Sequence, residues 1–151
     1  MCWARFRLNI LVSLFLTPAF CAVAGSQPVV VGHITGQGYP NFLGGAHTVA
    51  VANGYAYVTA YLDNSLTIIN ISNHTSQTVV GNVIGKGYPN YLGGACGVAV
   101  DGDYAYVGAF GDDCLTIIDI STPSSPTVVG YVGGMGNPNY PRFCVWRAEF
   151  D

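Results

Sequence analysis

The sequence predicts an all-β protein built from tandem repeats. Residues 30–78 and 79–127 align without a gap and are identical at 29 of 49 positions. A third copy starts at residue 128 and stops matching after about residue 140. Each copy contains short apolar runs separated by turn-forming residues, and none shows the periodicity of an amphipathic helix. A repeat of this length is typical of arrays of small supersecondary units.

The strands of the second copy can be placed from the turn signals between them. Strands are expected at residues 97–101, 104–110, 115–120 and 127–132. Gly102-Asp103, like Asn53-Gly54 in the first copy, favours a tight hairpin, because Gly and Asn tolerate the positive φ that such turns need. Four antiparallel strands per repeat follow from this reading.

Several expected strands are apolar on both faces, which predicts how the sheets are arranged. Residues 49–51 (VAV) and 66–69 (LTII) have almost no polar side chain to turn toward water. A strand buried on both faces needs a neighbouring sheet on each side. Stacked four-stranded sheets around an axis satisfy this need, so the sequence predicts a β-propeller in which each repeat is one blade.

Two in-phase segments resemble a known family. Residues 66–70 (LTIIN) and 115–121 (LTIIDIS), each preceded by a YAYV run, resemble the LVIVD repeat, a propeller blade of exported proteins. The resemblance covers residues 29–132 and implies no shared catalytic residues. Asn70 replaces the aspartate of the motif in the first copy.

The resulting prediction is a partial β-propeller of about two four-stranded antiparallel blades with an N-terminal outer strand, following a helical signal peptide. The repeats occupy residues 25–140, with blades at about 30–78 and 79–127 and a third begun at 128. Residues 141–151 diverge from the pattern, which favours a truncated fragment of a longer propeller. The alternative is self-association of several copies through open blade edges, because two blades do not close a ring.

Composition and charge limit the classes of protein that are possible. The 151 residues are 50% hydrophobic and only 9% charged, and they include 20 glycines and 8 prolines, as expected for a turn-rich globular domain. The net charge is −3, and removal of Arg5 and Arg7 with a leader would bring it to −5. This acidic balance argues against nucleic acid as a partner.

Residues 1–24 have the three parts of a secretory signal peptide. A basic start is followed by the short apolar run 8–16 and by the small-residue site Ala22-Val23-Ala24. We expect cleavage before Gly25 and a secreted or cell-surface protein. The apolar run is short for a bilayer, so we expect no stable membrane span after cleavage, with an uncleaved anchor as the alternative.

Three cysteines remain after such cleavage: Cys96, Cys114 and Cys144. Buried thiols are expected at Cys96 and Cys114, which replace His47 and Ser65 of the previous copy, whereas the disulfide state stays open. No pair has the spacing of a zinc site, and we expect neither a metal nor a cofactor.

The candidate ligand-binding residues lie in the loops that join consecutive blades and in the hairpins beside them. Residues 36–45 and 85–94 repeat the sequence GYPN and are expected on the same face as the second hairpin of each blade. Exposed aromatics, amides and carboxylates on one face suit a sugar, a peptide or a cation. Turn formation and packing between blades are the alternative roles. The six candidates are Tyr39, Asn41, Asp63, Tyr88, Asn90 and Asp112.

These observations predict a binding or adhesion scaffold with a protein or glycan ligand. No catalytic constellation is visible, because the chain lacks a Gly-x-Ser-x-Gly motif and its only adjacent carboxylates, Asp112 and Asp113, would point apart on a turn. The alternative is a fragment of a propeller hydrolase or lyase whose catalytic residues lie in other blades.

Overall fold

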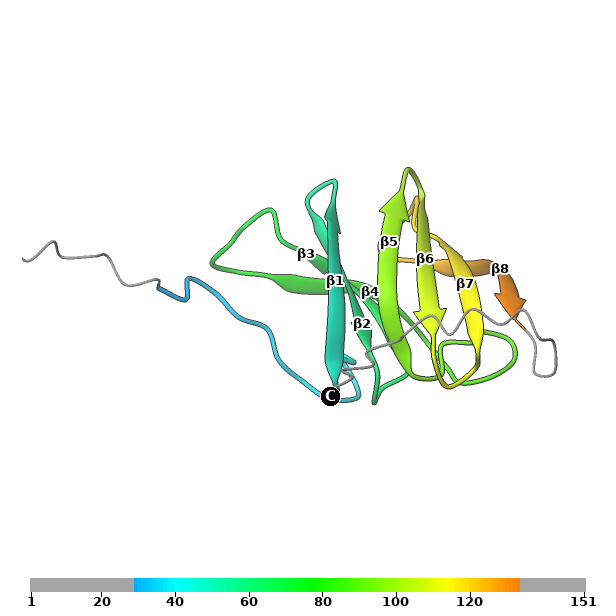
Figure 1. The fold of residues 1–151 in the computed structure, drawn as a ribbon. Helices are drawn as coiled ribbons and strands as arrows, with labels where there is room; N and C mark the ends of the chain where they lie inside the picture. Colours follow the sequence, from blue (N-terminus) through cyan, green and yellow to red (C-terminus); the bar gives the residue numbers. More distant parts are fainter. Residues whose placement is uncertain (1–28, 134–151) are drawn as a thin grey trace, which may run out of the picture.

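A computed structural model describes residues 29–133, and these residues form two four-stranded antiparallel sheets with no helix (Figure 1). The expected signal peptide and the divergent residues 141–151 lie outside the described range. Each sheet has its strands in sequential order. We call the first sheet blade 1 and the second blade 2. The strands are β1 (Ala46–Ala52), β2 (Tyr55–Ala60), β3 (Ser65–Asn70) and β4 (Thr78–Ile84) in blade 1, and β5 (Ala95–Asp101), β6 (Tyr104–Ala109), β7 (Cys114–Asp119) and β8 (Thr127–Gly133) in blade 2.

The strands pair in equivalent register in both blades. In blade 1, Ala52 pairs with Tyr55 across a two-residue turn in which Asn53 and Gly54 have φ of 51° and 80°. Positive φ at both central positions matches the twist of a hairpin. The register also shifts at equivalent places, between Ala46 and Thr48 and between Ala95 and Gly97. The predicted all-β fold with four antiparallel strands per repeat is confirmed.

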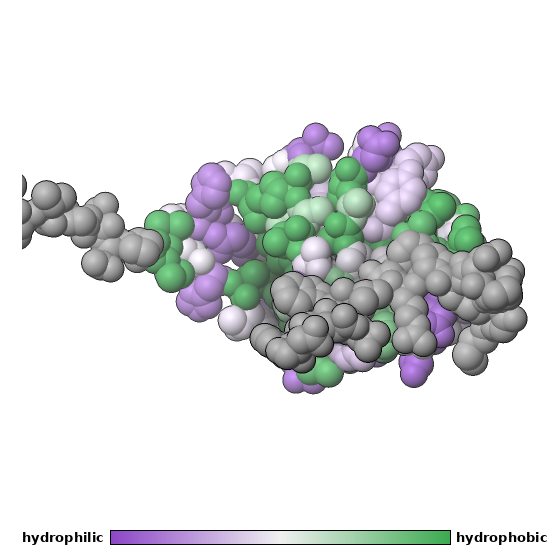
Figure 2. Space-filling model, viewed as in Figure 1, coloured by the Kyte–Doolittle hydropathy of each residue, from purple (hydrophilic) through white to green (hydrophobic). Residues whose placement is uncertain are grey.

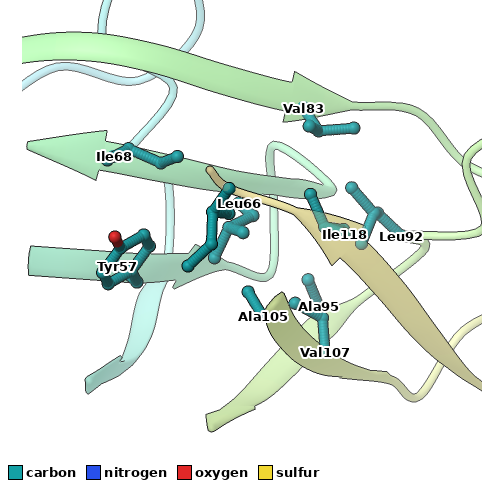
Figure 3. Packing of buried hydrophobic residues seen from close by; sticks show 10 residues of the cluster. Tyr57, Leu66, Ile68, Val83, Leu92, Ala95, Ala105, Val107 and Ile118 are labelled. Carbon is teal, nitrogen blue, oxygen red and sulfur yellow. The ribbon is translucent and has the colours of Figure 1, made fainter. Parts of the chain in front are cut away.

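The two blades bury one hydrophobic core between them (Figure 3). Tyr57, Leu66 and Ile68 of blade 1 are at most 2% exposed. They join Leu92, Ala105 and Ile118 of blade 2 in one cluster. Full burial of one such aliphatic side chain contributes about 1.5–3 kcal/mol, so the stacking of the blades is a main source of stability.

Polar contacts fix the position of one blade on the other. The carbonyl of Cys96 accepts hydrogen bonds from Thr48 Oγ1 at 2.5 Å and from His47 Nδ1 at 2.8 Å. Because the acceptor is a carbonyl, His47 carries its proton on Nδ1. At the same end of β1 and β5, Gly94 N donates to Asn64 Oδ1 at 2.8 Å.

The outer strand of blade 1 also lies against the next blade. A Cβ added at Gly81 in β4 would clash with the carbonyl of Pro123 and lie 3.0 Å from Cδ of Pro126. Gly32, one repeat earlier, meets the carbonyl of His74 and the side chain of Gln77 in the same way. Residues 29–35 therefore run where the outer strand of a preceding blade would run, although they belong to neither described sheet.

One expected burial does not hold on the outer face of blade 1. All four residues of the 66–69 run are buried, as predicted. Val49 and Val51, in contrast, are 58% and 65% exposed. They lie on the face of blade 1 that is turned away from blade 2, and within residues 29–133 no second sheet packs on this face.

Gly81→Ala tests the close approach between the blades. The added methyl group must displace the Pro123 carbonyl, so we expect the free energy of unfolding to fall by about 1–3 kcal/mol. The matched control is Gly130→Ala, at the equivalent position in β8, where a Cβ meets nothing within 4 Å in one copy of the chain. Both variants are compared at a protein concentration low enough for the chain to be monomeric. Urea denaturation of both variants measures the difference, and equal stability would contradict this packing.

Candidate ligand-binding rim

The two loops that precede β1 and β5 have the same backbone conformation. Gly36 and Gly85 have φ of 140° and 136°, and Phe42 and Tyr91 have φ of 48° and 47°. In each loop the peptide bond before proline, Tyr39-Pro40 or Tyr88-Pro89, is cis. The shared residues of the repeat thus encode one loop shape twice, and we call these loops and the adjoining β2–β3 and β6–β7 hairpins the rim.

A carboxylate from the hairpin holds each loop closed. In blade 2, Asp112 Oδ2 accepts hydrogen bonds from Gly87 N at 2.8 Å and Gly93 N at 2.7 Å. In blade 1, Asp63 Oδ2 accepts the equivalent pair, from Gly38 N at 2.8 Å and Gly44 N at 2.6 Å. Charge-assisted bonds of this kind are among the stronger hydrogen bonds in proteins.

The other side of each loop is held by side chains of the third strand. Ser65 Oγ and Thr67 Oγ1 each donate to the carbonyl of Phe42 at 2.9 Å. In blade 2, Thr116 Oγ1 donates to the carbonyl of Tyr91 at 2.7 Å, and Cys114 Sγ lies 3.3 Å from the same oxygen. The polar atoms of these buried strands are therefore used to orient the rim.

The two candidate asparagines are also part of the loop framework. Asn41 Nδ2 donates to the carbonyl of Thr35 at 2.5 Å, and Asn90 Nδ2 donates to the carbonyl of Ile84 at 2.7 Å. Each asparagine lines a shallow groove beside the outer strand of its own blade. The grooves are equivalent, and Pro40 and Pro89 line them at the same position.

The two candidate tyrosines differ from the other four residues because their side chains are free to meet a ligand. Tyr39 and Tyr88 are 87% and 83% exposed. Each ring touches the next aromatic of its loop edge-on, Phe42 at 6.2 Å and Tyr91 at 6.4 Å between ring centroids. These contacts restrict the tyrosines while leaving their faces accessible.

A hollow of about 620 Å³ adjoins the rim of blade 2. Its aromatic wall is Tyr91 packed on Tyr131, with 4.1 Å between ring centroids. Lys86 and Asp113 contribute opposite charges to its lining, beside Asp112. Tyr131 was not anticipated from the repeat, because the equivalent residue of the previous copy is Asn82.

The structure thus brings the six predicted residues to one rim in two equivalent sets. Asp63 lies with the loop that carries Tyr39 and Asn41, and Asp112 lies with the loop of Tyr88 and Asn90. The carboxylates and amides bind their own backbone, and the tyrosines face solvent. Within residues 29–133, no group of three or more His, Cys, Asp or Glu side chains is arranged to hold a metal ion.

The two described cysteines behave differently. Cys114 is a buried free thiol, as expected, and burial raises its pKa. Cys96 is equally buried but is disulfide-bonded, so the expectation of a buried thiol there is wrong. Burial alone did not distinguish the two, because a disulfide depends on the position of the second sulfur in space.

Comparison with known proteins agrees with the geometry of the blades and the rim. Four antiparallel strands stacked face to face on an equivalent sheet define a propeller-like repeat protein. The family model of the LVIVD repeat matches residues 43–84 and 92–133, which together make up more than half of the chain. The chain therefore belongs to the LVIVD repeat family. No curated protein sequence matches it significantly. Among residues 29–133 there is also no helix long and apolar enough to cross a membrane.

Asp112→Ala tests the carboxylate that closes the loop of blade 2. Two backbone amides lose their acceptor, so we expect a loss of about 1–3 kcal/mol in the free energy of unfolding. Asp103→Ala, at an exposed acid in the hairpin at the other end of the blade, should change it by less than about 0.5 kcal/mol. Chemical denaturation compares the two, and a similar effect from both would show that the carboxylate does not hold the loop.

The thiol of Cys114 should be protected in the folded protein. Because burial keeps it protonated and covered, we expect alkylation at neutral pH to be roughly a hundredfold slower than in the unfolded chain. Peptide mapping by mass spectrometry identifies the modified cysteine. Cys114→Ser should retain the fold, since Ser65 makes the equivalent bond in blade 1. Rapid alkylation of Cys114 in the native chain would contradict this burial.

Proposed function

We propose that this protein is a secreted or cell-surface scaffold that binds a glycan or protein ligand through its rim. The observation that carries the proposal is the pair of tyrosines, Tyr39 and Tyr88, which stand at the same position of two equivalent loops and are more than four-fifths exposed. Tyrosine is enriched at interfaces because its ring offers a large apolar contact area and its hydroxyl a polar one. The leader of residues 1–24 supports an exported location.

The loops suit recognition because they are ordered before a ligand binds. Asp63 and Asp112 close them through backbone amides, and the edge-on contacts with Phe42 and Tyr91 limit the motion of the exposed rings. A preformed aromatic surface loses little conformational entropy on binding. The polar phenol and apolar ring of tyrosine together fit the mixed surface of a sugar ring.

The repetition of the site favours a ligand that is itself repetitive. Two equivalent binding positions on one rigid body raise the apparent affinity for a polymer with regularly spaced units, such as a polysaccharide, without any new contact. We therefore favour an oligosaccharide chain over a single small molecule.

A glycan array probed with the labelled full chain tests the proposal. We expect the double variant Tyr39→Ala with Tyr88→Ala to bind at least about tenfold more weakly to those oligosaccharides on the array that bind the unchanged protein. The reason is that each aromatic contact contributes about 0.5–1.5 kcal/mol beyond its burial. Each single variant should lose part of this affinity.

The matched control is Tyr104→Ala, at an exposed tyrosine beside the hairpin at the other end of blade 2. Its binding should equal that of the unchanged protein. Full retention of binding by the double variant would exclude the rim tyrosines, and an unchanged protein that binds no glycan would exclude this ligand class.

A further inference from the structure

The interface inside the molecule joins two different faces of the blade. Blade 1 contributes what we call the forward face, which includes Tyr57, Leu66, Ile68 and Val83. Blade 2 contributes the back face, which includes Ala95, Val98, Val100, Ala105 and Ile118. Because the blades are repeats of each other, each also has the face that the other uses. The forward face of blade 2 and the back face of blade 1 are left at opposite ends of the part of the chain that the structure describes.

The forward face of blade 2 is apolar and partly uncovered. Tyr106, Leu115 and Ile117 are the equivalents of Tyr57, Leu66 and Ile68, and all three are half-buried rather than fully buried. The contrast is largest in the outer strands. Val83 in β4 is 7% exposed, whereas Val132 at the same place in β8 is 69% exposed.

The back face of blade 1 is uncovered along β1, whereas Thr67 and Ile69 of β3 on the same face are buried. Val49 and Val51 are 58% and 65% exposed, whereas Val98 and Val100 at the same positions pack against the core. Ala46 is exposed, whereas its equivalent Ala95 is 0% exposed. Figure 2 shows apolar surface on the side of the molecule that carries β1.

The residues that make two further contacts of the internal interface recur at the free ends. The hydrogen bond from Gly94 N to Asn64 Oδ1 joins the rims of the two blades. The equivalent acceptor in blade 2 is Asp113, and the equivalent donor in blade 1 is the amide of Gly45. Gly81 is covered by the loop that carries Pro123, whereas a Cβ at the equivalent Gly130 meets nothing within 4 Å.

We propose that the forward face of blade 2 binds the back face of blade 1 of a second copy of this chain, in the geometry of the internal interface. In that arrangement, Val132 packs as Val83 does. Asp113 accepts a hydrogen bond from Gly45 N of the second copy, and Gly130 lies under the loop of residues 72–77 of that copy. The contact is heterologous, so copies add head to tail and end in a ring if the rotation closes.

Residues 29–35 of the second copy must move aside when β8 docks, because they run along the place that β8 takes. Val29, Val30 and Val31 are 78%, 80% and 63% exposed, whereas Ile34, the equivalent of Val132, is half-buried. Their displacement therefore exchanges the burial of Ile34 for that of Val132 and adds the burial of Val49 and Val51.

A second copy is favoured over an unrelated partner because the chain itself contains a working example of the interface. Both open faces are near-copies of surfaces that already pack together, with side chains of the same type at Val49, Val51, Leu115 and Ile117. The inference does not rest on the proposed ligand, because Tyr39 and Tyr88 are outside both faces.

Sedimentation velocity of the full chain over a range of concentrations tests the proposal. The unchanged protein should assemble reversibly into dimers and larger species. Gly130→Ala should raise the dissociation constant at least tenfold, because its methyl group meets a backbone carbonyl only in the docked state. A protein that stays monomeric at every concentration would overturn the proposal.

Complementation separates head-to-tail assembly from other contacts. Val132→Glu blocks the forward face of blade 2, and Val51→Glu blocks the back face of blade 1. Both sites are well exposed, so both variants should fold, which circular dichroism checks. Each variant alone should be monomeric, and an equimolar mixture should form one dimer and nothing larger.

Persistent self-association of either variant alone would show that the copies meet through other surfaces and would overturn the proposal. Tyr88→Ala should assemble like the unchanged protein. The assembly test and the glycan test can therefore fail independently.

Discussion

Every blade of this protein depends on having another sheet beside it. The strand β3 has no solvent face, since Leu66, Thr67, Ile68 and Ile69 are all at most 4% exposed. One side is covered by blade 2, and the threonine on the other side bonds to the rim loop that folds over it. A single repeat of this kind cannot bury its apolar faces without a neighbouring unit. Stacking is therefore part of the folding of each repeat.

The same constraint links the core to the rim. The buried hydroxyls of Ser65, Thr67 and Thr116 need acceptors, and the carbonyls of residues 42 and 91 supply them. A polar group buried without a partner would cost about 1–3 kcal/mol. Satisfying the buried strand therefore also fixes the loop that presents the tyrosines, so stability and candidate recognition use the same hydrogen bonds.

Repetition made most of the fold predictable from the sequence. The turn residues and the strands that are apolar on both faces were enough to predict the strands, their antiparallel order and the stacked arrangement of the sheets. Exposure at the ends was not predictable, because Val49 and Val98 have the same local sequence and differ only in what lies beside them. The roles of Asp63 and Asp112 were also missed, since the amides they bind lie 19 and 25 residues away along the chain. Tyr131 carried no repeat signal, and the disulfide of Cys96 depends on distance in space.

The carboxylate closures have a consequence for how such loops can change over time. Asp63 and Asp112 recognise only main-chain amides, so they impose no requirement on the side chains at the tips. A Cβ at Gly93 would lie 2.6 Å from Asp112 Oδ1, so the requirement for glycine is confined to the base of the loop. Residues 39 and 88 can therefore be exchanged without refolding the segment around them. A blade of this kind can acquire a new specificity by point substitution alone, and neighbouring blades of one chain can diversify independently while keeping a common frame.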